Sequence, residues 1–193
     1  MPRTLSAPLR LLCLLSLAVL AGCNPYTSGY KYASDPRETS VLAGDKAIST
    51  EILARFADNE AVGMTDLSAS AYDGQVYLVG EYLNTAQLEA AKRIAAKVEG
   101  VRGVTVYARP RSEREDCSDL ANLALAQEVG ARLVADDIVH GYNVDVKALQ
   151  CRTIVLLGLV ADKAEIAQAK AVAAKVQGVD NVVSYLKVYT QQN

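Results

Sequence analysis

Several residue types that enzymes depend on are scarce in this chain of 193 residues. Trp is absent, Phe56 is the only phenylalanine and His140 is the only histidine. Histidine is the usual general base near neutral pH and a common metal ligand, so its scarcity argues against both kinds of site. The cores must be built from valine, leucine, isoleucine and alanine. We expect no catalytic residues, no metal site and no cofactor.

The few polar groups that could do chemistry lack partners in the sequence. His140 lies in the loop-like stretch Val139-His140-Gly141-Tyr142, without a serine or cysteine motif beside it. Asp136 and Asp137 are adjacent at a helix end, where neighbouring side chains do not face each other. We interpret His140 as a surface histidine and the two aspartates as solvated charges. The chain is not expected to be an enzyme.

Positive charge is also limited. The chain has 22 acidic and 20 basic residues, for a formal net charge of −2, and no cluster of lysine and arginine stands out. Proteins that bind nucleic acid need such a cluster to contact phosphates. The balance argues against a nucleic-acid partner and against attraction to anionic lipids through a polybasic stripe.

The first 22 residues have the pattern of an export signal. Arg3 and Arg10 precede the apolar run Leu11–Leu20, which is too short to span a bilayer core of ~30 Å. The run ends in Leu20-Ala21-Gly22-Cys23, which resembles the lipobox of bacterial lipoproteins. That resemblance implies cleavage before Cys23 and acylation of its thiol and amino group. The alternative is an ordinary signal peptide with an incidental cysteine.

Acylation would fix the destination of the chain. Each buried methylene contributes roughly 0.8 kcal/mol, and two acyl chains give stable attachment to a membrane. Asn24 follows Cys23 where an aspartate would favour the inner membrane, so we expect the periplasmic face of the outer membrane, with the inner membrane as the alternative. Residues 23–44 mix glycine, proline and serine without sustained periodicity, which predicts a flexible tether.

The rest of the chain contains an internal repeat. Leu78-Val79-Gly80 recurs as Leu156-Leu157-Gly158, and Ala95-Ala96-Lys97-Val98-Glu99-Gly100-Val101 recurs as Ala173-Ala174-Lys175-Val176-Gln177-Gly178-Val179. A fixed period indicates a duplicated structural unit. We therefore expect two small domains, at residues 45–109 and 119–190, joined by a charged linker at 110–118.

Each copy predicts the order α-β-β-α-β. Apolar residues at helical spacing predict a first helix from Asp45 to Ala57 in copy one. Strands follow, and Asn84 and Asp162 are placed to cap the second helix, the latter in a capping box with Glu165. The helical apolar positions are Ile48, Ile52 and Phe56 in copy one and Leu125, Val129 and Leu133 in copy two.

Turn residues support this order. Asp73-Gly74 is a hairpin signal, replaced by the longer Gln150-Cys151-Arg152 in copy two. Glycines are expected at structural positions in both copies: after the hairpin strand at Gly80 and Gly158, after the second helix at Gly100 and Gly178, and in the turn at Gly74. The resulting fold class is α+β, with a three-stranded sheet covered on one face by two helices.

This element order, the strand glycines and the Gly-Val pairs after the second helices resemble the BON domain family. With the lipobox, the chain is similar to dual-BON-domain outer-membrane lipoproteins. The resemblance implies a non-enzymatic periplasmic module that binds phospholipid membranes and supports envelope integrity. The turn at Cys151-Arg152 departs from the family pattern. The resemblance supplies no lipid-contact residues.

Four cysteines are present, and Cys13 leaves with the signal segment. If Cys23 is acylated, Cys117 and Cys151 remain as an even pair in an oxidising compartment. A disulfide between them would stabilise a small domain by roughly 3–4 kcal/mol in the chain-entropy model. An intermolecular link and two free thiols are the alternatives.

Two hypotheses for function remain. In the first, the acylated Cys23 anchors the chain, and the two domains bind phospholipid headgroups or the membrane surface. In the second, the anchor alone contacts the membrane, and the domains dock an envelope protein of the assembly or secretion machinery. Sheet edges or an apolar groove between the domains would carry that contact. The stretch Ile138-Val139 is either an exposed apolar lip or a packing element.

Overall fold

The computed structural model describes residues 35–63, 67–111, 113 and 117–189. The signal segment, Cys23 and the first part of the predicted tether lie outside these residues. No helix in the described part of the chain is both long and apolar enough to cross a membrane.

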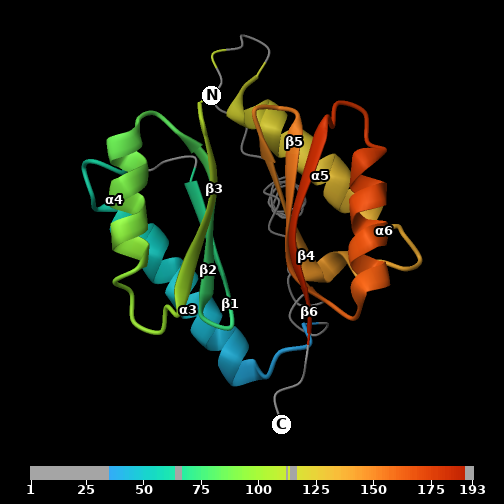
Figure 1. The fold of residues 1–193 in the computed structure, drawn as a ribbon, viewed down its shortest axis with the longest axis horizontal. Coiled ribbons are helices and arrows are strands. Elements are labelled where there is room, and N and C mark those ends of the chain that lie inside the picture. The colour runs from blue at the N-terminus through green and yellow to red at the C-terminus, as the bar shows by residue number, and fades with distance from the viewer. Residues whose placement is uncertain (1–34, 64–66, 112, 114–116, 190–193) are drawn as a thin grey trace, which may run out of the picture. The chain divides into compact units, whose positions relative to one another are not determined.

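The predicted order α-β-β-α-β is confirmed in both copies, which we call repeat one and repeat two (Figure 1). Repeat one consists of α3 (Thr39–Ala57), β1 (Leu67–Tyr72), β2 (Gln75–Tyr82), α4 (Thr85–Ala95) and β3 (Gly103–Pro110). Repeat two consists of α5 (Asp119–Val134), a short 3-10 helix (Gly141–Asn143), β4 (Val144–Leu149), β5 (Thr153–Val160), α6 (Lys163–Ala174) and β6 (Asn181–Val188).

Each repeat forms its own three-stranded sheet, in the orders β1-β2-β3 and β4-β5-β6. The first two strands of a sheet are antiparallel and joined by a hairpin, whereas the third strand pairs with the second in parallel. Parallel neighbours need a crossover connection, which α4 and α6 provide. Figure 1 shows α3 and α4 on one face of the first sheet, as the predicted α+β class requires.

The helical face predicted from apolar spacing is the one that packs on the sheet. Ile48, Ile52 and Phe56 of α3 are buried with Leu78 of β2 in the core of repeat one. In repeat two, Val129 and Leu133 are fully buried, and Leu125 packs against the same core. Each repeat therefore has a separate core between its helices and one face of its sheet.

The opposite faces of the two sheets form a third apolar cluster. Tyr72, Tyr77 and Val79 of repeat one are buried in it with Leu149, Val155 and Leu157 of repeat two. Both faces of each sheet are thus covered. This double burial explains why the central strands are continuous apolar runs rather than alternating ones.

Aromatic residues line this third cluster. The rings of Tyr77 and Tyr185 lie 5.4 Å apart between centroids, and Tyr107 contacts Tyr185 edge-on at 6.4 Å. Burial raises the pKa of the Tyr185 phenol, and its two tyrosine neighbours raise it further. These tyrosines supply apolar area together with ring contacts between the repeats.

Two element boundaries differ from the sequence expectation. The helix α3 begins at Thr39 and not at Asp45, because the Asp45 carboxylate is buried in a contact with the hairpin and does not mark a solvated helix end. Strands β2 and β5 continue beyond Gly80 and Gly158. A Cβ at Gly158 would collide with the carbonyl oxygen of Asn143, so this glycine permits a close backbone approach instead of ending the strand.

The predicted helix caps are present, with one change. Asn84 accepts a hydrogen bond from Gln87 N at 2.9 Å, and Asp162 accepts one from Glu165 N at 2.8 Å. In a capping box Glu165 would bind the N–H of Asp162. Its carboxylate instead accepts the N–H groups of Ala161 and His140, both at 2.7 Å, and so fastens the loop after α5 to α6.

Candidate functional site

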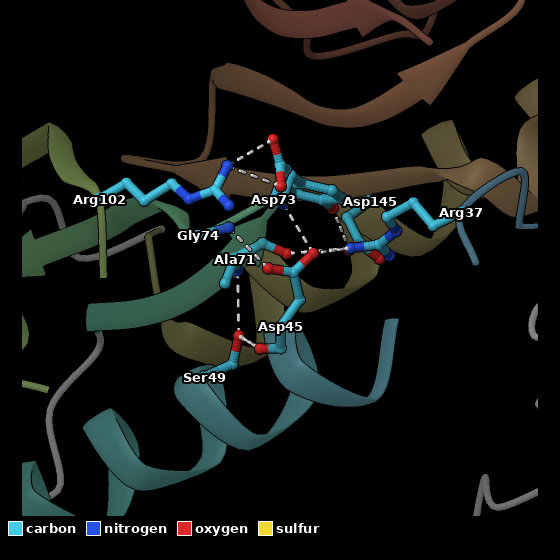
Figure 2. A network of polar contacts seen from close by, with 9 residues as sticks. Arg37, Asp45, Ser49, Ala71, Asp73, Gly74, Arg102 and Asp145 are labelled. Carbon is cyan, nitrogen blue, oxygen red and sulfur yellow. Dashed lines mark hydrogen bonds and ion pairs between the residues drawn. The ribbon is translucent and has the colours of Figure 1, made fainter. Parts of the chain in front are cut away.

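A buried carboxylate on α3 organises the hairpin of repeat one (Figure 2). Asp45, only 4% exposed, accepts the N–H groups of Asp73 at 2.7 Å and Gly74 at 2.8 Å. Its charge is balanced by the guanidinium of Arg37, with Nη1 2.6 Å from the carboxylate. A buried charge is tolerated when it is both paired and hydrogen-bonded, and Asp45 meets both conditions.

The same helix holds the end of β1. The Ser49 hydroxyl accepts the N–H of Ala71 at 3.0 Å and donates to the Asp45 carbonyl at 2.9 Å. Arg37 Nη1 also donates to the Ala71 carbonyl at 3.3 Å, and its guanidinium lies 5.1 Å from the centre of the Tyr72 ring. The hairpin is therefore fixed to its own first helix at several points.

A groove of about 480 Å³ opens beside this network. Arg37, Tyr72 and Asp73 form part of its wall on the side of repeat one, and Leu159 and Lys187 form part of it on the side of repeat two. Tyr72 also donates its hydroxyl proton to Asp145 of repeat two at 2.6 Å. The groove thus lies where the two repeats meet.

The cations around the groove differ in their surroundings. Arg102 Nη1 lies 3.0 and 3.1 Å from the two carboxylate oxygens of Asp73, in an exposed ion pair that contributes little to stability. Lys187 is exposed, and its ammonium lies 5.6 Å from the centre of the Tyr77 ring. The groove combines aromatic and aliphatic walls with charge at its rim.

The corresponding position in repeat two is built differently. Asn122 occupies on α5 the place that Asp45 occupies on α3, and its Oδ1 accepts the N–H of Cys151 at 2.8 Å. Its Nδ2 donates to Glu81 of repeat one at 3.1 Å. Glu81, 6% exposed, also accepts the N–H of Gln150 at 2.6 Å. The second hairpin is therefore held by a carboxylate from the other repeat.

The predicted cysteine pair lies at this second hairpin. The structure joins Cys117, which precedes α5, to Cys151 in the turn, with Cα atoms 5.5 Å apart. Gln150 and Cys151 both have left-handed backbone angles, at φ values of 51° and 55°, which non-glycine residues adopt at a cost of about 1–2 kcal/mol each. This three-residue turn is the longer of the two hairpin turns, as the sequence predicts. The bonds to Asn122 and Glu81 and the disulfide hold it in this conformation.

His140 and the paired aspartates do not form a reactive cluster. The His140 ring is 68% exposed, and its Nδ1 lies 3.1 Å from Glu165. Asp136 accepts N–H groups from Ile138 and Val139 and a side-chain bond from Gln168, so it is a loop-stabilising residue. Among the described residues, no three potential metal ligands gather in one place.

Exposed apolar side chains concentrate on α5 and the loop after it. Leu120 is 73% exposed and Leu123 is 53% exposed, one turn apart at the start of the helix. Val134 and Ile138 are exposed near its other end, whereas Val139 is buried in the core of repeat two. Only the first residue of the Ile138-Val139 stretch could therefore touch another surface.

Sequence reasoning missed Arg37, Asp45, Glu81 and Asn122 as contact residues. Arg37 lies in the predicted tether, Asp45 begins the predicted first helix, and Glu81 directly follows the strand glycine Gly80. A signal was nevertheless present. Asp45 and Asn122 occupy equivalent places in the two copies, each before a run of helical apolar positions. A polar residue retained at an otherwise buried face indicates a hydrogen-bonding role.

Comparison with known proteins agrees with the duplicated architecture. The sequence model of the BON domain family matches residues 44–108 and 122–189. The chain is 30% identical over 163 residues to osmotically-inducible protein Y of Escherichia coli K12, an alignment that covers 83% of this chain and 81% of that protein.

A solved structure of CdsD, a structural protein of the type III secretion system of Chlamydia trachomatis, is 13% identical with a TM-score of 0.31. The alignment covers 75% of this chain and 63% of CdsD. Such a distant likeness adds nothing to the assignment, which depends on the two matched regions and on the curated relative. By those two findings, the chain belongs to the BON domain family and carries two copies of the domain.

Proposed function

We propose that this chain is a lipid-anchored periplasmic module that binds phospholipid membranes and supports the integrity of the outer membrane. Membership of the BON domain family and the similarity to osmotically-inducible protein Y support an envelope role. The export signal and the lipobox-like Cys23 support attachment to the periplasmic face of the outer membrane. The chain acts by binding and not by catalysis.

The exposed apolar side of α5 is the observation that carries this proposal. Leu120, Leu123, Gln127, Gly130 and Val134 follow one another at helical spacing along the outer side of the helix, and none of them is charged. The equivalent stripe on α3 contains Lys46 and Thr50. An uncharged stripe with exposed leucines suits a helix that lies in the membrane interface.

The energy of such a contact is moderate. Transfer of an exposed leucine side chain out of water contributes about 1.5–3 kcal/mol, so two leucines give weak, reversible binding. Acylation at Cys23 would supply stable attachment, and the stripe would then set how the folded part meets the lipid surface. An anchor and a weak contact together suffice without a basic patch.

Vesicle binding tests this proposal. We expect the mature chain from residue 23, with Cys23→Ser in place of the acylated residue, to sediment with vesicles of phosphatidylethanolamine and phosphatidylglycerol. The double variant Leu120→Asp and Leu123→Asp should bind at least tenfold more weakly, because it removes two apolar groups that would enter the membrane interface and adds two charges. Leu53→Asp is the matched control, since Leu53 is 43% exposed on the equivalent helix of repeat one.

Two outcomes would count against the proposal. If the unacylated chain binds no vesicle of either lipid, the folded part does not contact membranes. If crosslinking in the envelope then returns one dominant protein through α5, the chain is an interaction scaffold, as in the second hypothesis. Equal losses for the α5 variant and for Leu53→Asp would remove the assignment to α5.

A further inference from the structure

The interface between the two sheets has a hairpin at each end, one from each repeat. The two hairpins occupy equivalent places in the repeats, but their contacts differ. At the end formed by the second hairpin, Gln150 donates its N–H to Glu81 at 2.6 Å and its side-chain amide to the Pro110 carbonyl at 3.0 Å. These two contacts close that end. The second hairpin thereby bonds both to β2 and to the end of β3 in the other repeat.

At the other end, the equivalent residues cannot make this closure. Asp73 takes the place of Gln150, and its carboxylate faces Arg102. Leu159 takes the place of Glu81, because it follows Gly158 as Glu81 follows Gly80. A leucine offers no acceptor to a hairpin N–H, and those N–H groups bond to Asp45 instead. The groove of about 480 Å³ lies at this open end.

Two cations at the groove have donors to spare. Within the described part of the chain, Lys187 has no ion pair, and its ammonium contacts only the ring of Tyr77. Arg102 uses Nη1 alone for both oxygens of Asp73. Its Nε and Nη2 therefore have no partner among the described residues. Both side chains are exposed and line the same groove. Lysine and arginine donors are the groups that hold a phosphate in proteins.

The groove also offers an apolar wall. Leu159, Val188 and Val41 line it together with the rings of Tyr72 and Tyr189. The carboxylates of Glu38 and Asp73 also line the groove, and Asp73 is paired with Arg102. A ligand that uses Lys187, the remaining donors of Arg102 and this wall needs an anionic group and an apolar portion. The volume of the groove falls within the range of about 300–1,000 Å³ for small-molecule sites. A stable protein contact needs a surface of roughly 1,000 Å² or more, so the groove suits a small molecule.

We propose that the groove binds the headgroup region of a single anionic phospholipid, with the phosphate between Lys187 and Arg102 and the glycerol and first methylenes against Leu159 and Tyr72. The inference rests on the proposed phospholipid function and adds to it a specific site. That site is distinct from the apolar stripe on α5. It would select lipids by the charge of the headgroup, whereas the stripe would contact only the apolar part of the membrane interface.

A titration with soluble lipid tests the site. The mature chain with Cys23→Ser is titrated with dihexanoyl phosphatidylglycerol below its micelle concentration and followed by amide chemical shifts. We expect shifts at Asp73, Lys187 and their neighbours. Lys187→Gln should weaken binding about tenfold, which corresponds to the loss of one charge-assisted hydrogen bond. Arg102→Gln should act in the same direction.

The chain supplies a matched control. Arg109 is the repeat-one equivalent of Lys187, and it lies over the ring of Tyr107 at 5.3 Å. Arg109→Gln removes a cation of the same kind at the closed end, so binding should stay within twofold of the parent. Dihexanoyl phosphatidylcholine, which carries no net charge, should bind more weakly, and glycerol 3-phosphate, which lacks acyl chains, should bind more weakly still.

Several results would overturn the inference. Unchanged affinity in Lys187→Gln, or an equal loss in Arg109→Gln, would show that the groove does not hold the phosphate. Glycerol 3-phosphate bound as tightly as the lipid would assign the site to a free phosphate ester. Benzoylphenylalanine in place of Tyr189 should capture lipid in cells, and capture of one protein would reject the lipid assignment. If vesicles still bind in these cases, the proposed function stands without this site.

Discussion

The two hairpins of this protein occupy equivalent places in the repeats but are held by opposite strategies. The hairpin of repeat one is fixed by a side chain of its own repeat, the Asp45 carboxylate, which also pairs with Arg37. The hairpin of repeat two is fixed by the neutral Asn122, by Glu81 from the other repeat and by a disulfide. Duplication kept the geometry and changed the source of the contacts. In these contacts the first hairpin bonds to its own helix, whereas the second also bonds to the other repeat.

The charges beside the two hairpins are also reversed. In repeat one the hairpin residue Asp73 pairs with Arg102 in the loop after α4. In repeat two the hairpin residue Arg152 pairs with Asp180 in the loop after α6. In both repeats the same loop position donates its N–H to a hairpin carbonyl at 2.8 Å. The backbone contact is common to both copies, so the exposed ion pair is the exchangeable part.

Loss of Asp45 should have the largest effect. Asp45→Ala leaves two hairpin N–H groups without their acceptor and the buried Arg37 guanidinium without its counter-charge. Removing one partner of a buried pair costs about 3–5 kcal/mol. Urea unfolding should show this loss in the free energy of unfolding. Asp45→Asn, which copies repeat two, should lose less than Asp45→Ala, and an equal loss would mean that the charge is decisive.

Removal of the disulfide should come next. We expect Cys117→Ser combined with Cys151→Ser to lower the free energy of unfolding by about 2–4 kcal/mol, because the unfolded chain is no longer constrained. The turn residues Gln150 and Cys151 would also have fewer contacts to hold their left-handed backbone. Thiol labelling of the unreduced protein provides the direct check. If both cysteines are labelled before reduction, the bridge is absent in solution.

Glu81 tests whether repeat two depends on repeat one. Glu81→Leu copies Leu159 and removes the acceptor for the Gln150 N–H and the Asn122 side chain. An unsatisfied buried group costs about 1–3 kcal/mol. Amide hydrogen exchange at Gln150 should accelerate, while exchange at Gly74 should not change. Faster exchange at both hairpins would show a general loss of stability and contradict the one-way dependence.

The repeat, the element order and the helical faces could be predicted because they are local or periodic. Ile48, Ile52 and Phe56 follow from spacing alone, and the caps at Asn84 and Asp162 from residue type and position. The role of Asp45 could not be read in this way, because its partners at Asp73 and Gly74 lie on a different element. The only sign of the third cluster in the sequence is a strand with apolar residues on both faces, such as Val155-Leu156-Leu157, because such a strand must be covered on both sides.

The groove could not be predicted from either copy alone. It depends on which residue of one repeat faces the hairpin of the other, and therefore on how the two sheets meet. Glu81 and Leu159 are both compatible with a strand that continues past a glycine, so the sequence offers no reason to contrast them. Only the contacts of Gln150 with Glu81 and Pro110 show that one end is closed.

The smallest effect is expected in the loops that follow the first helices. Asp136 accepts N–H groups from Ile138 and Val139, whereas its counterpart Asn59 accepts that of Ala61. The bond from the Gln168 side chain, followed by the Ile138 N–H, holds the pKa of Asp136 below its ordinary value of 3.8. A carboxyl whose folded pKa is lowered stabilises the protein above its unfolded pKa, and this contribution is lost as the pH falls through the folded pKa.

Asp136→Asn, which copies repeat one, should therefore flatten the acid side of a plot of melting temperature against pH. At neutral pH the melting temperature should fall only slightly, because the contribution of the charge is lost while the amide partly replaces the hydrogen bonds of this half-buried side chain. Asp137→Asn is the matched control on the adjacent residue. A loss of the same size at neutral and acid pH would show that the side chain acts through its hydrogen bonds alone, without a contribution from its charge.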